Sequence, residues 1–471
     1  MHKNWIARTL EALVLVCGAA AGSVGPAAVI HEWGTFTALQ DEEGRAVAGI
    51  NVDDEPVPGF VHDVAAGLVG ARERVLRKYS KGTIPAAHPL ITMRLETPVL
   101  YVHLPPGTES LRLDVDVAFR GGWLSQYFPN AVAEAPGLDP RGRGMLTSDT
   151  IGTLQWKDVR AHHEARPGPE TTDPVWLAPR RVEAATLTVG DENERFLFYR
   201  GLGHVDAPLR IARDSEGDAL LVRGAVPRDL LKNGPLSVGT LWLADIRADG
   251  TTAWRSVQCA DISAGAQAAG AVLAALPAVF RESDYGRREA SATLRAELRR
   301  ALVRDGLFED EAESLLATWD ASYFRAPGLR LFFLVPRAWT ERILHLRLSV
   351  QCETVRTMVG RIDLVTPVQR RLIERITAGP TSDGKWYYEA SEARTRARAS
   401  QPYDLGEILA ERGTNVPADY RAYVDLGRFR DAILLDAQDR RPRYALGRFL
   451  ETYRIRASEV LTAPLTAAGP R

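Results

Sequence analysis

The chain has 471 residues, of which 45% are hydrophobic and 25% are charged, and its formal net charge is −1 at pH 7. This composition is typical of globular proteins, and the length is sufficient for several domains and a sizeable core. A net charge near zero argues against a nucleic-acid partner, because such partners are bound largely through phosphate neutralisation by Lys and Arg. We therefore expect a globular protein that does not bind nucleic acid.

The first 28 residues have the layout of a secretory signal peptide, in which a basic start precedes the apolar run ALVLVCGAAAG and then small residues. The run is too short to span a bilayer as a stable helix, so we expect cleavage just before His31 and no transmembrane span in the mature chain. An alternative is lipid anchoring through Cys17, although Val16 is bulkier than the residue that such sites need. The sequence thus predicts a periplasmic or secreted protein.

The mature chain is predicted to have an α+β fold with a β-rich, sandwich-like body over residues 29–263. Residues 97–104 and 111–119 are rich in β-branched and apolar residues and flank PPGTES, which predicts a hairpin. Further strands are predicted by runs of the same kind at 195–201, 237–247, 329–335 and 344–352. The strands at 329–365 are expected to complete the body.

Two regions are predicted to be helical, an insertion at 264–328 and a C-terminal region at 366–471. In the insertion, AGAQAAGAVLAALPAVF and RREASATLRAELRRALVRDG are rich in Ala and Leu, and Gly306 is expected to end a helix before LFEDEAESLLATWDASYF. The C-terminal region opens with Thr366 as a cap, Pro367 at the first helical position and Gln369 three residues after the cap. The tetrapeptide LGRF occurs at 426–429 and 446–449, which predicts two helices that pack alike.

Cys259 and Cys352 are the only cysteines after the predicted signal peptide, and each ends the tetrapeptide SVQC. The repetition suggests two related β units in the same or facing sheets, on either side of the helical insertion. The sequence leaves two alternatives open for this pair: one disulfide bond, or two buried thiols.

The stretch VIHEWGTFT at residues 29–37 supplies the first candidate site. If it is extended, side chains alternate between its faces, so His31 lies with Trp33 on one face and Glu32 lies with Ile30 and Phe36 on the other. Neighbours on a strand serve one site only if a bulge intervenes. We expect Glu32 to be enclosed and paired, and His31 to line a pocket that solvent reaches.

The segment GLGHVDAPL at 201–209 supplies the second candidate site. His204 and Asp206 are two residues apart and offer one nitrogen and one oxygen to a divalent metal ion. The alternative is a turn stabilised by Asp206 with an exposed His204.

Two classes of function fit these residues, since no Walker loop, dinucleotide fingerprint, G-x-S-x-G elbow or H-E-x-x-H motif occurs. The favoured class is an exported hydrolase-like enzyme with His31, Glu32 and Glu96 as candidate catalytic residues. The alternative is a non-catalytic binding or scaffold protein that contacts cell-envelope material. Convergence of either His31 or Glu32 with Glu96, His204 and Asp206 in one open pocket would favour the enzyme, and scattering of these residues into separate buried networks would count against it.

Five motifs resemble an uncharacterised family of predicted exported bacterial proteins: HEWGTFT, ETPVLY at 96–101, GGWLSQYFP at 121–129, FYRGLG at 198–203 and MVGRIDLVTP at 358–367. The resemblance covers most of the mature chain, and HEWGTFT is its most specific part. It implies export but supplies no established activity. It also implies that an aromatic residue often replaces His103, so His103 is not expected to be a ligand.

Overall fold

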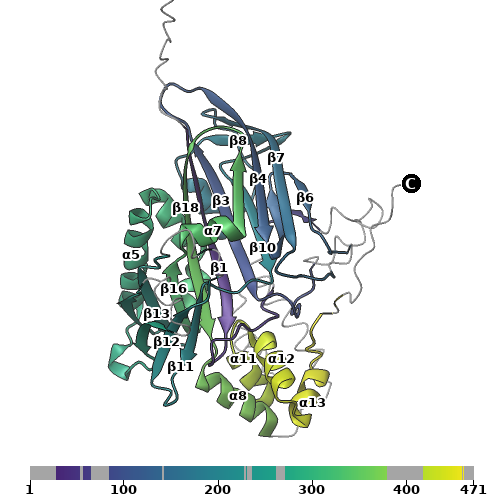
Figure 1. The fold of residues 1–471 in the computed structure, drawn as a ribbon, viewed down its shortest axis with the longest axis vertical. Helices are drawn as coiled ribbons and strands as arrows, with labels where there is room; N and C mark the ends of the chain where they lie inside the picture. The colour runs from purple at the N-terminus through teal and green to yellow at the C-terminus, as the bar shows by residue number, and fades with distance from the viewer. Residues whose placement is uncertain are drawn as a thin grey trace, which may run out of the picture.

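A computed structural model describes residues 28–52, 57–64, 84–139, 143–226, 230, 236–260, 271–378, 417–458 and 460. The predicted signal peptide and Cys17 lie outside the described residues. The fold is α+β, as the sequence predicts, with a large sheet, a second small sheet and helices at several of its margins (Figure 1). None of the described helices is long and apolar enough to cross a membrane.

The large sheet contains most of the strands. From one edge to the other they are β14 (Thr252–Gln258), β13 (Thr240–Ile246), β16 (Gly328–Leu334), β18 (Glu353–Leu364), β1 (Val29–Gln40), β3 (Met93–His103), β10 (Leu197–Gly203), β5 (Gly122–Phe128), β7 (Ile151–His162), β4 (Ser110–Arg120) and β17 (Leu344–Leu348). Four short strands pair at its margin: β2 (His62–Asp63), β6 (Val132–Glu134), β8 (Thr186–Val189) and β9 (Glu192–Glu194). The second sheet contains β11 (Leu209–Arg213), β12 (Ala219–Gly224) and β15 (Val272–Pro277).

The helical segments occupy three parts of the described chain. Two short segments precede β8: α3 (Pro174–Leu177) and η1 (Pro179–Arg181). The middle group comprises η3 (Glu282–Asp284), α5 (Arg288–Arg304), α6 (Glu309–Thr318), the π-helical η4 (Ala321–Arg325) and α7 (Arg337–Ile343). The C-terminal group comprises α8 (Pro367–Ala378), α11 (Ala418–Asp425), α12 (Arg430–Arg440) and α13 (Tyr444–Thr452).

The strand β1 lies in the middle of the large sheet and is buried on both faces. It pairs in parallel with β18 and antiparallel with β3. On one face Trp33 packs in a hydrophobic cluster with residues of α5, α6 and η4, whereas Ile30 and Phe36 pack in a second cluster with α7 and the small sheet. The predicted alternation of faces is therefore confirmed, and both faces of the HEWGTFT stretch are core.

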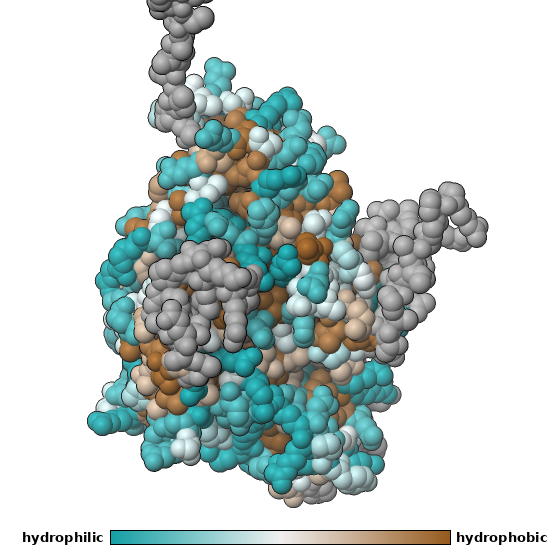
Figure 2. All heavy atoms as spheres, in the orientation of Figure 1, coloured by the Kyte–Doolittle hydropathy of each residue, from teal (hydrophilic) through white to brown (hydrophobic). Residues whose placement is uncertain are grey.

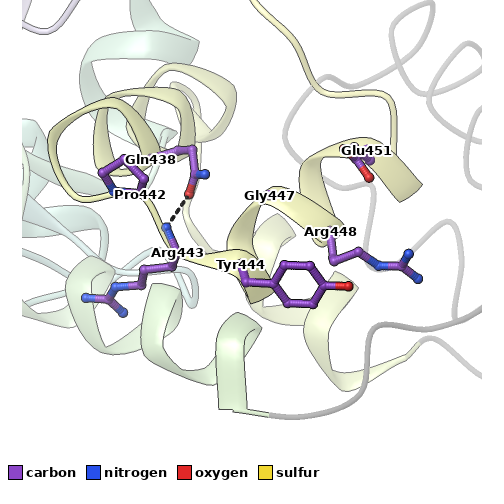
Figure 3. A pocket seen from close by; sticks show the side chains of 7 residues that line it. All are labelled: Gln438, Pro442, Arg443, Tyr444, Gly447, Arg448 and Glu451. Atoms are coloured by element: carbon purple, nitrogen blue, oxygen red, sulfur yellow. Dashed lines mark hydrogen bonds between the residues drawn. The ribbon is translucent and has the colours of Figure 1, made fainter.

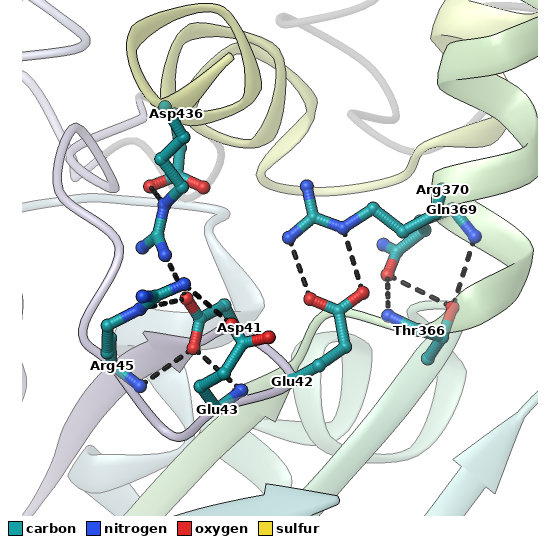
Figure 4. A network of polar contacts seen from close by, with 9 residues as sticks. Asp41, Glu42, Glu43, Arg45, Thr366, Gln369, Arg370 and Asp436 are labelled. Carbon is teal, nitrogen blue, oxygen red and sulfur yellow. Dashed lines mark hydrogen bonds and ion pairs between the residues drawn. The ribbon is translucent and has the colours of Figure 1, made fainter. Parts of the chain in front are cut away.

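Two C-terminal segments are anchored to the end of β1 by ion pairs (Figure 4). Asp41 pairs with Arg45 at 2.9 Å and also with Arg440 of α12. Glu42 forms a two-pronged ion pair with Arg370 of α8, at 2.8 and 2.7 Å. The C-terminal helices gather at one end of the sheet as a result (Figure 1).

Several predictions of individual elements are confirmed. Strands β14 and β17 belong to the same large sheet, where they form its two opposite edges. Gly306 separates α5 from α6 with a φ of +115°, and Thr366 and Gln369 exchange the hydrogen bonds of a capping box at the start of α8. Cys352 is a free thiol, so no disulfide joins it to Cys259.

Three predicted elements differ from the structure. The predicted helix over 264–280 contains the strand β15, because pairing with β12 overrides the helical preference of its Ala and Leu residues. The predicted hairpin is wrong: β3 pairs with β1 and β10, whereas β4 pairs with β7 and β17. The first LGRF forms the turn between α11 and α12 and the second lies in α13, so the two do not pack alike.

Candidate functional site

Two histidines and one glutamate form the polar cluster on the helix-covered face of β1. His31 pairs with Tyr101 in the antiparallel register of β1 and β3. His103 lies two residues beyond Tyr101 on the same face of β3, so it is the diagonal neighbour of His31 and lies within reach of its side chain. The ring centroids of His31 and His103 are 4.9 Å apart.

Helix α6 supplies the carboxylate of this cluster. Gly306 and Leu307 connect α5 to α6, and the backbone N–H of Phe308 donates a hydrogen bond of 2.8 Å to Glu311 Oε2. Carboxylates in the first turn of a helix are stabilised by its unpaired N–H groups, which explains the position of Glu311. The α5–α6 hairpin thereby brings Glu311 against the central strands of the sheet.

The three side chains are in direct contact and are almost fully enclosed. His31 Nδ1 lies 2.6 Å from Glu311 Oε2, and His103 Nε2 lies 2.9 Å from Glu311 Oε1. The exposed fractions of the side chains are 2% for His31, 0% for Glu311 and 14% for His103. One donor atom from each residue lies within 4.8 Å of the others, which is compatible with a metal site.

The environment of Glu311 favours its charged form. Burial by itself would raise the pKa of this carboxyl group. Hydrogen bonds from His103 and His31, the charge of His31 and the N–H of Phe308 outweigh burial and lower the pKa below its usual value of 4.5. The cluster therefore presents a carboxylate that is held ionised between two imidazoles.

The aromatic ring of Phe308 covers the cluster. Its centroid lies 4.6 Å from that of His31 and 4.8 Å from that of His103, while Phe308 itself is 48% exposed. Phe308 therefore contributes to covering both imidazoles, and His103 keeps 14% of its side chain exposed. The prediction that His31 lines a solvent-reachable pocket is wrong, because α6 and Phe308 cover the face on which it lies.

Glu32 points to the opposite face and enters a separate network. Its carboxylate pairs with Arg356 Nε of β18 at 2.5 Å and accepts a hydrogen bond from the hydroxyl group of Tyr199 in β10. Arg356 also donates to the carbonyl of Leu344 at 2.7 Å. The expectation that Glu32 is enclosed and paired with a charged group is confirmed.

Glu96 lies farther along the same face as His31 but does not join the cluster. It is opposite Thr35 in the sheet, four residues along β1 from His31, which corresponds to about 13 Å at the usual rise of a strand. Its carboxylate accepts a hydrogen bond from Thr37 at 2.9 Å and pairs with Arg94 and Arg428 at 2.9 Å each. Two guanidinium groups therefore neutralise Glu96.

His204 and Asp206 lie after β10, and the structure does not assemble a metal site around them. His204 Nδ1 donates to the carbonyl of Leu90 at 2.8 Å, and Asp206 pairs with Arg210 at 3.6 Å. Within the described part of the chain, the group of His31, His103 and Glu311 is the one set of three residues placed to hold an ion. The two glycines of GLGH accommodate the ring of Phe119, since a Cβ at Gly201 or Gly203 would approach that ring to 3.0 or 2.8 Å.

The five candidate residues thus do not converge, and two members of the observed cluster were not predicted. His103 could have been found by aligning VLYVH antiparallel to VIHEW, which puts both histidines on one face. Glu311 could not have been found in this way, because its position depends on how the α5–α6 hairpin packs on the sheet. A surface hollow of about 340 Å³ lies between α12 and α13 (Figure 3). Neither the five candidate residues nor the members of the observed cluster line it.

Comparisons with known proteins assign no family. A scan against protein-family models and a search of curated proteins found no match. Among solved structures, the Fcho1 Mu homology domain of Danio rerio with a bound Eps15 peptide is similar over 73% of this chain and 96% of that chain, with 11% identity and a TM-score of 0.23. A TM-score of this size carries no argument about fold or function, so the site is interpreted from its geometry.

Proposed function

We propose that this protein is an exported, hydrolase-like metalloenzyme whose divalent metal ion is bound by His31, His103 and Glu311. One observation carries the proposal: the fold brings two imidazoles and one carboxylate from three distant segments within 4.8 Å of one another. Two nitrogen donors and one oxygen donor form a ligand set that zinc uses in hydrolytic enzymes. We therefore name zinc as the expected ion.

The direct contacts in the cluster can rearrange into metal ligation with small movements. Zinc lies about 2.0 to 2.2 Å from nitrogen and oxygen ligands, which puts neighbouring ligand atoms of a tetrahedral site roughly 3.4 Å apart. The carboxylate of Glu311 is 2.6 and 2.9 Å from the two imidazole nitrogens. To admit the ion, the two carboxylate–imidazole separations would lengthen by less than about 1 Å, the protons in these contacts would be lost, and the ligand atoms, which now lie within 4.8 Å of one another, would all move to the spacing of such a site.

A zinc ion held by three protein ligands keeps a fourth position for water or substrate and lowers the pKa of bound water to about 7. In this protein His103 is the most exposed of the three residues, and Phe308 lies against both imidazoles, so these two side chains would lie on the approach to a bound ion. His31 and Glu311 would fix the ion from the buried side. Phe308 would exclude bulk water until a substrate displaces its ring.

The sequence supports the proposed compartment and the proposed class of partner. The signal-peptide layout and the resemblance to predicted exported proteins support a periplasmic or secreted location. Cell-envelope material is therefore the partner that such an enzyme would meet. Glu32 and Glu96 would stabilise the fold, because their carboxylates are already paired with arginines.

Metal analysis of the purified mature chain tests the proposal. The protein is incubated separately with Zn²⁺ and Fe²⁺, dialysed and analysed by mass spectrometry. We expect one zinc ion per chain, and we expect the variants His31→Ala, His103→Ala and Glu311→Gln to lose it while remaining folded by circular dichroism. If the protein retains iron but not zinc, the three residues would still form a metal site. The bound ion would then be iron, and the zinc chemistry proposed above would not apply.

The matched control is His62→Ala. His62 forms a histidine–carboxylate pair with Glu192 at 2.8 Å but lacks a second histidine, so its removal should leave the zinc content unchanged. A folded parent protein that retains neither metal would contradict the proposal. The cluster would then be a buried clamp between α6 and the sheet, and the non-catalytic binding or scaffold function would be favoured.

A further inference from the structure

The C-terminal helices form a basic end of the molecule. Residues 366–378 and 417–458 contain twelve arginines and seven aspartates or glutamates, whereas the whole chain has a formal net charge of −1. These helices gather at one end of the large sheet (Figure 1). Positive charge is therefore concentrated at one end of a chain that is nearly neutral overall, and such a concentration attracts anionic partners.

Three exposed arginines at this end have no carboxylate partner in the described part of the chain. They are Arg371 of α8, Arg441 directly after α12 and Arg448 of α13. Their neighbours Arg440 and Arg443 are, in contrast, each held by an acidic side chain at 2.7 Å. An arginine without an internal partner keeps its charge and its N–H donors for an external anion.

A contact between α8 and α13 brings these arginines together. Arg443, at the start of α13, pairs with Glu374 of α8 at 2.7 Å. Arg371 lies one helical turn before Glu374 on α8, so it faces the same side. Arg448 lies one turn after Tyr444 on α13, and Figure 3 shows these two side chains next to each other. The two helices thereby present their charges as one patch.

Exposed apolar and aromatic side chains lie among these arginines. Tyr444 is 84% exposed, and Val368, one turn before Arg371 on α8, is 53% exposed. The hollow of about 340 Å³ between α12 and α13 opens beside Tyr444. Tyrosine is enriched at membrane–water interfaces, where its ring meets the apolar layer and its hydroxyl group stays in water. Such side chains beside unpaired arginines are typical of surfaces that bind anionic membranes.

We infer that this basic end docks on a membrane surface that contains anionic phospholipids. Arg371, Arg441 and Arg448 would contact headgroup phosphates, and Tyr444 would place its ring between the headgroups. Charge complementarity selects an anionic partner. The exposed Tyr444 and Val368 select a surface that has an apolar layer beneath its charges.

The basic end is distant from the histidine cluster. Asp41, directly after β1, forms an ion pair with Arg440, which precedes Arg441, whereas His31 lies ten residues before Asp41. At the usual rise of a strand this separation is about 33 Å. The inference is therefore independent of the proposed metal site, and a chain that binds no metal would still dock.

Co-sedimentation of the purified mature chain with vesicles tests the inference. One vesicle type contains phosphatidylcholine alone, and the other contains equal parts of phosphatidylcholine and phosphatidylglycerol. We expect the chain to bind the mixed vesicles in about 0.1 M NaCl and to be released in about 0.5 M NaCl, because salt screens exposed charges. Replacing both Arg441 and Arg448 by alanine should weaken this binding roughly twentyfold, from about fivefold for each basic residue near an anionic surface.

Two further variants separate the apolar contribution from the charge. Tyr444→Ala should weaken binding to the mixed vesicles and leave its salt dependence unchanged, because the variant loses apolar contact and no charge. Glu451 lines the same hollow as Tyr444 and Arg448, and its carboxylate opposes the headgroup phosphates. Glu451→Gln should therefore bind the mixed vesicles more tightly than the parent.

The matched control replaces Arg288 and Arg304 by alanine, which removes two exposed arginines of α5 and the same amount of charge. It should bind the mixed vesicles as the parent does. Equal binding to both vesicle types, no binding to the mixed vesicles, or an equal loss in the control and in the variant of Arg441 and Arg448 would each overturn the inference. All substituted side chains are exposed, so the variants are expected to fold, and circular dichroism verifies this.

Discussion

Adjacent residues of β1 belong to two separate polar networks because a strand directs neighbouring side chains to opposite faces. His31 contacts Glu311 of the helical insertion, whereas Glu32 contacts Arg356 and Tyr199 within the sheet. Both residues are buried, so each needs a partner that offsets the loss of water. The HEWGTFT motif is therefore a strand in which one face serves the candidate site and the other stabilises the sheet.

Replacing Glu32 by alanine should destabilise the protein strongly. The change leaves the guanidinium of Arg356 buried without its carboxylate, and breaking one partner of a buried ion pair typically costs about 3 to 5 kcal/mol. The free energy of unfolding from urea titration measures the effect. The double variant Glu32→Ala with Arg356→Met should recover part of the loss, and an unchanged midpoint in Glu32→Ala would refute the role of this pair.

The carboxyl group of Glu311 should make the protein sensitive to acid. Because its pKa is lower in the folded chain than the usual 4.5, its contribution to stability is present above that pH and is lost as the pH falls through the folded value. Glu311→Gln should be less stable than the parent by about 1 to 3 kcal/mol near neutral pH. Thermal unfolding as a function of pH should show this difference shrinking below pH 4.5, and a constant difference would argue against an ionised Glu311.

At the scale of elements, local signals predict the helices better than the pairing of strands. The Thr366 cap and the Gly306 stop depend on residues next to them in sequence, and both are found as predicted. The partner of β3 depends on residues 29–40 and 197–203, which no local pattern reveals. His103 likewise depends on the pairing of β3 with β1, and Glu311 was missed because it lies 280 residues from His31 in sequence.

Gly306 should be required for the position of α6. It has a φ of +115°, and a Cβ there would lie 2.9 Å from Val355 Cγ1. Gly306→Ala should therefore reduce the free energy of unfolding by more than the roughly 1 to 3 kcal/mol expected from backbone strain alone. Gly217→Ala is the control, because Gly217 has a φ of +81° with no atom within 4 Å of its Cβ position. Equal losses in the two variants would show that the contact with Val355 is unimportant.

At the scale of the whole molecule, the large sheet is covered on both faces, and the candidate metal cluster lies on one of them. The helical insertion covers the face of His31, and α7 with the small sheet covers the other. The surface in Figure 2 mixes hydrophilic and hydrophobic residues over this body.

The proposed export concerns the whole chain and is testable directly. Expressed in a bacterium with its own leader, the protein should be recovered outside the cytoplasm with an N-terminus between about Ala21 and His31, as the signal layout predicts. N-terminal sequencing of the periplasmic and secreted fractions measures this. Recovery of the intact chain from Met1 in the cytosol would exclude the proposed compartment.

The most direct test of the central claim is a crystal of the zinc-soaked mature protein measured on both sides of the zinc absorption edge. We predict one anomalous peak about 2.0 to 2.2 Å from a nitrogen of His31, a nitrogen of His103 and an oxygen of Glu311. The peak should be absent from crystals of His103→Ala. Electron density that shows Glu311 still hydrogen-bonded to both histidines in the soaked parent crystal, with no anomalous peak among them, would contradict the account.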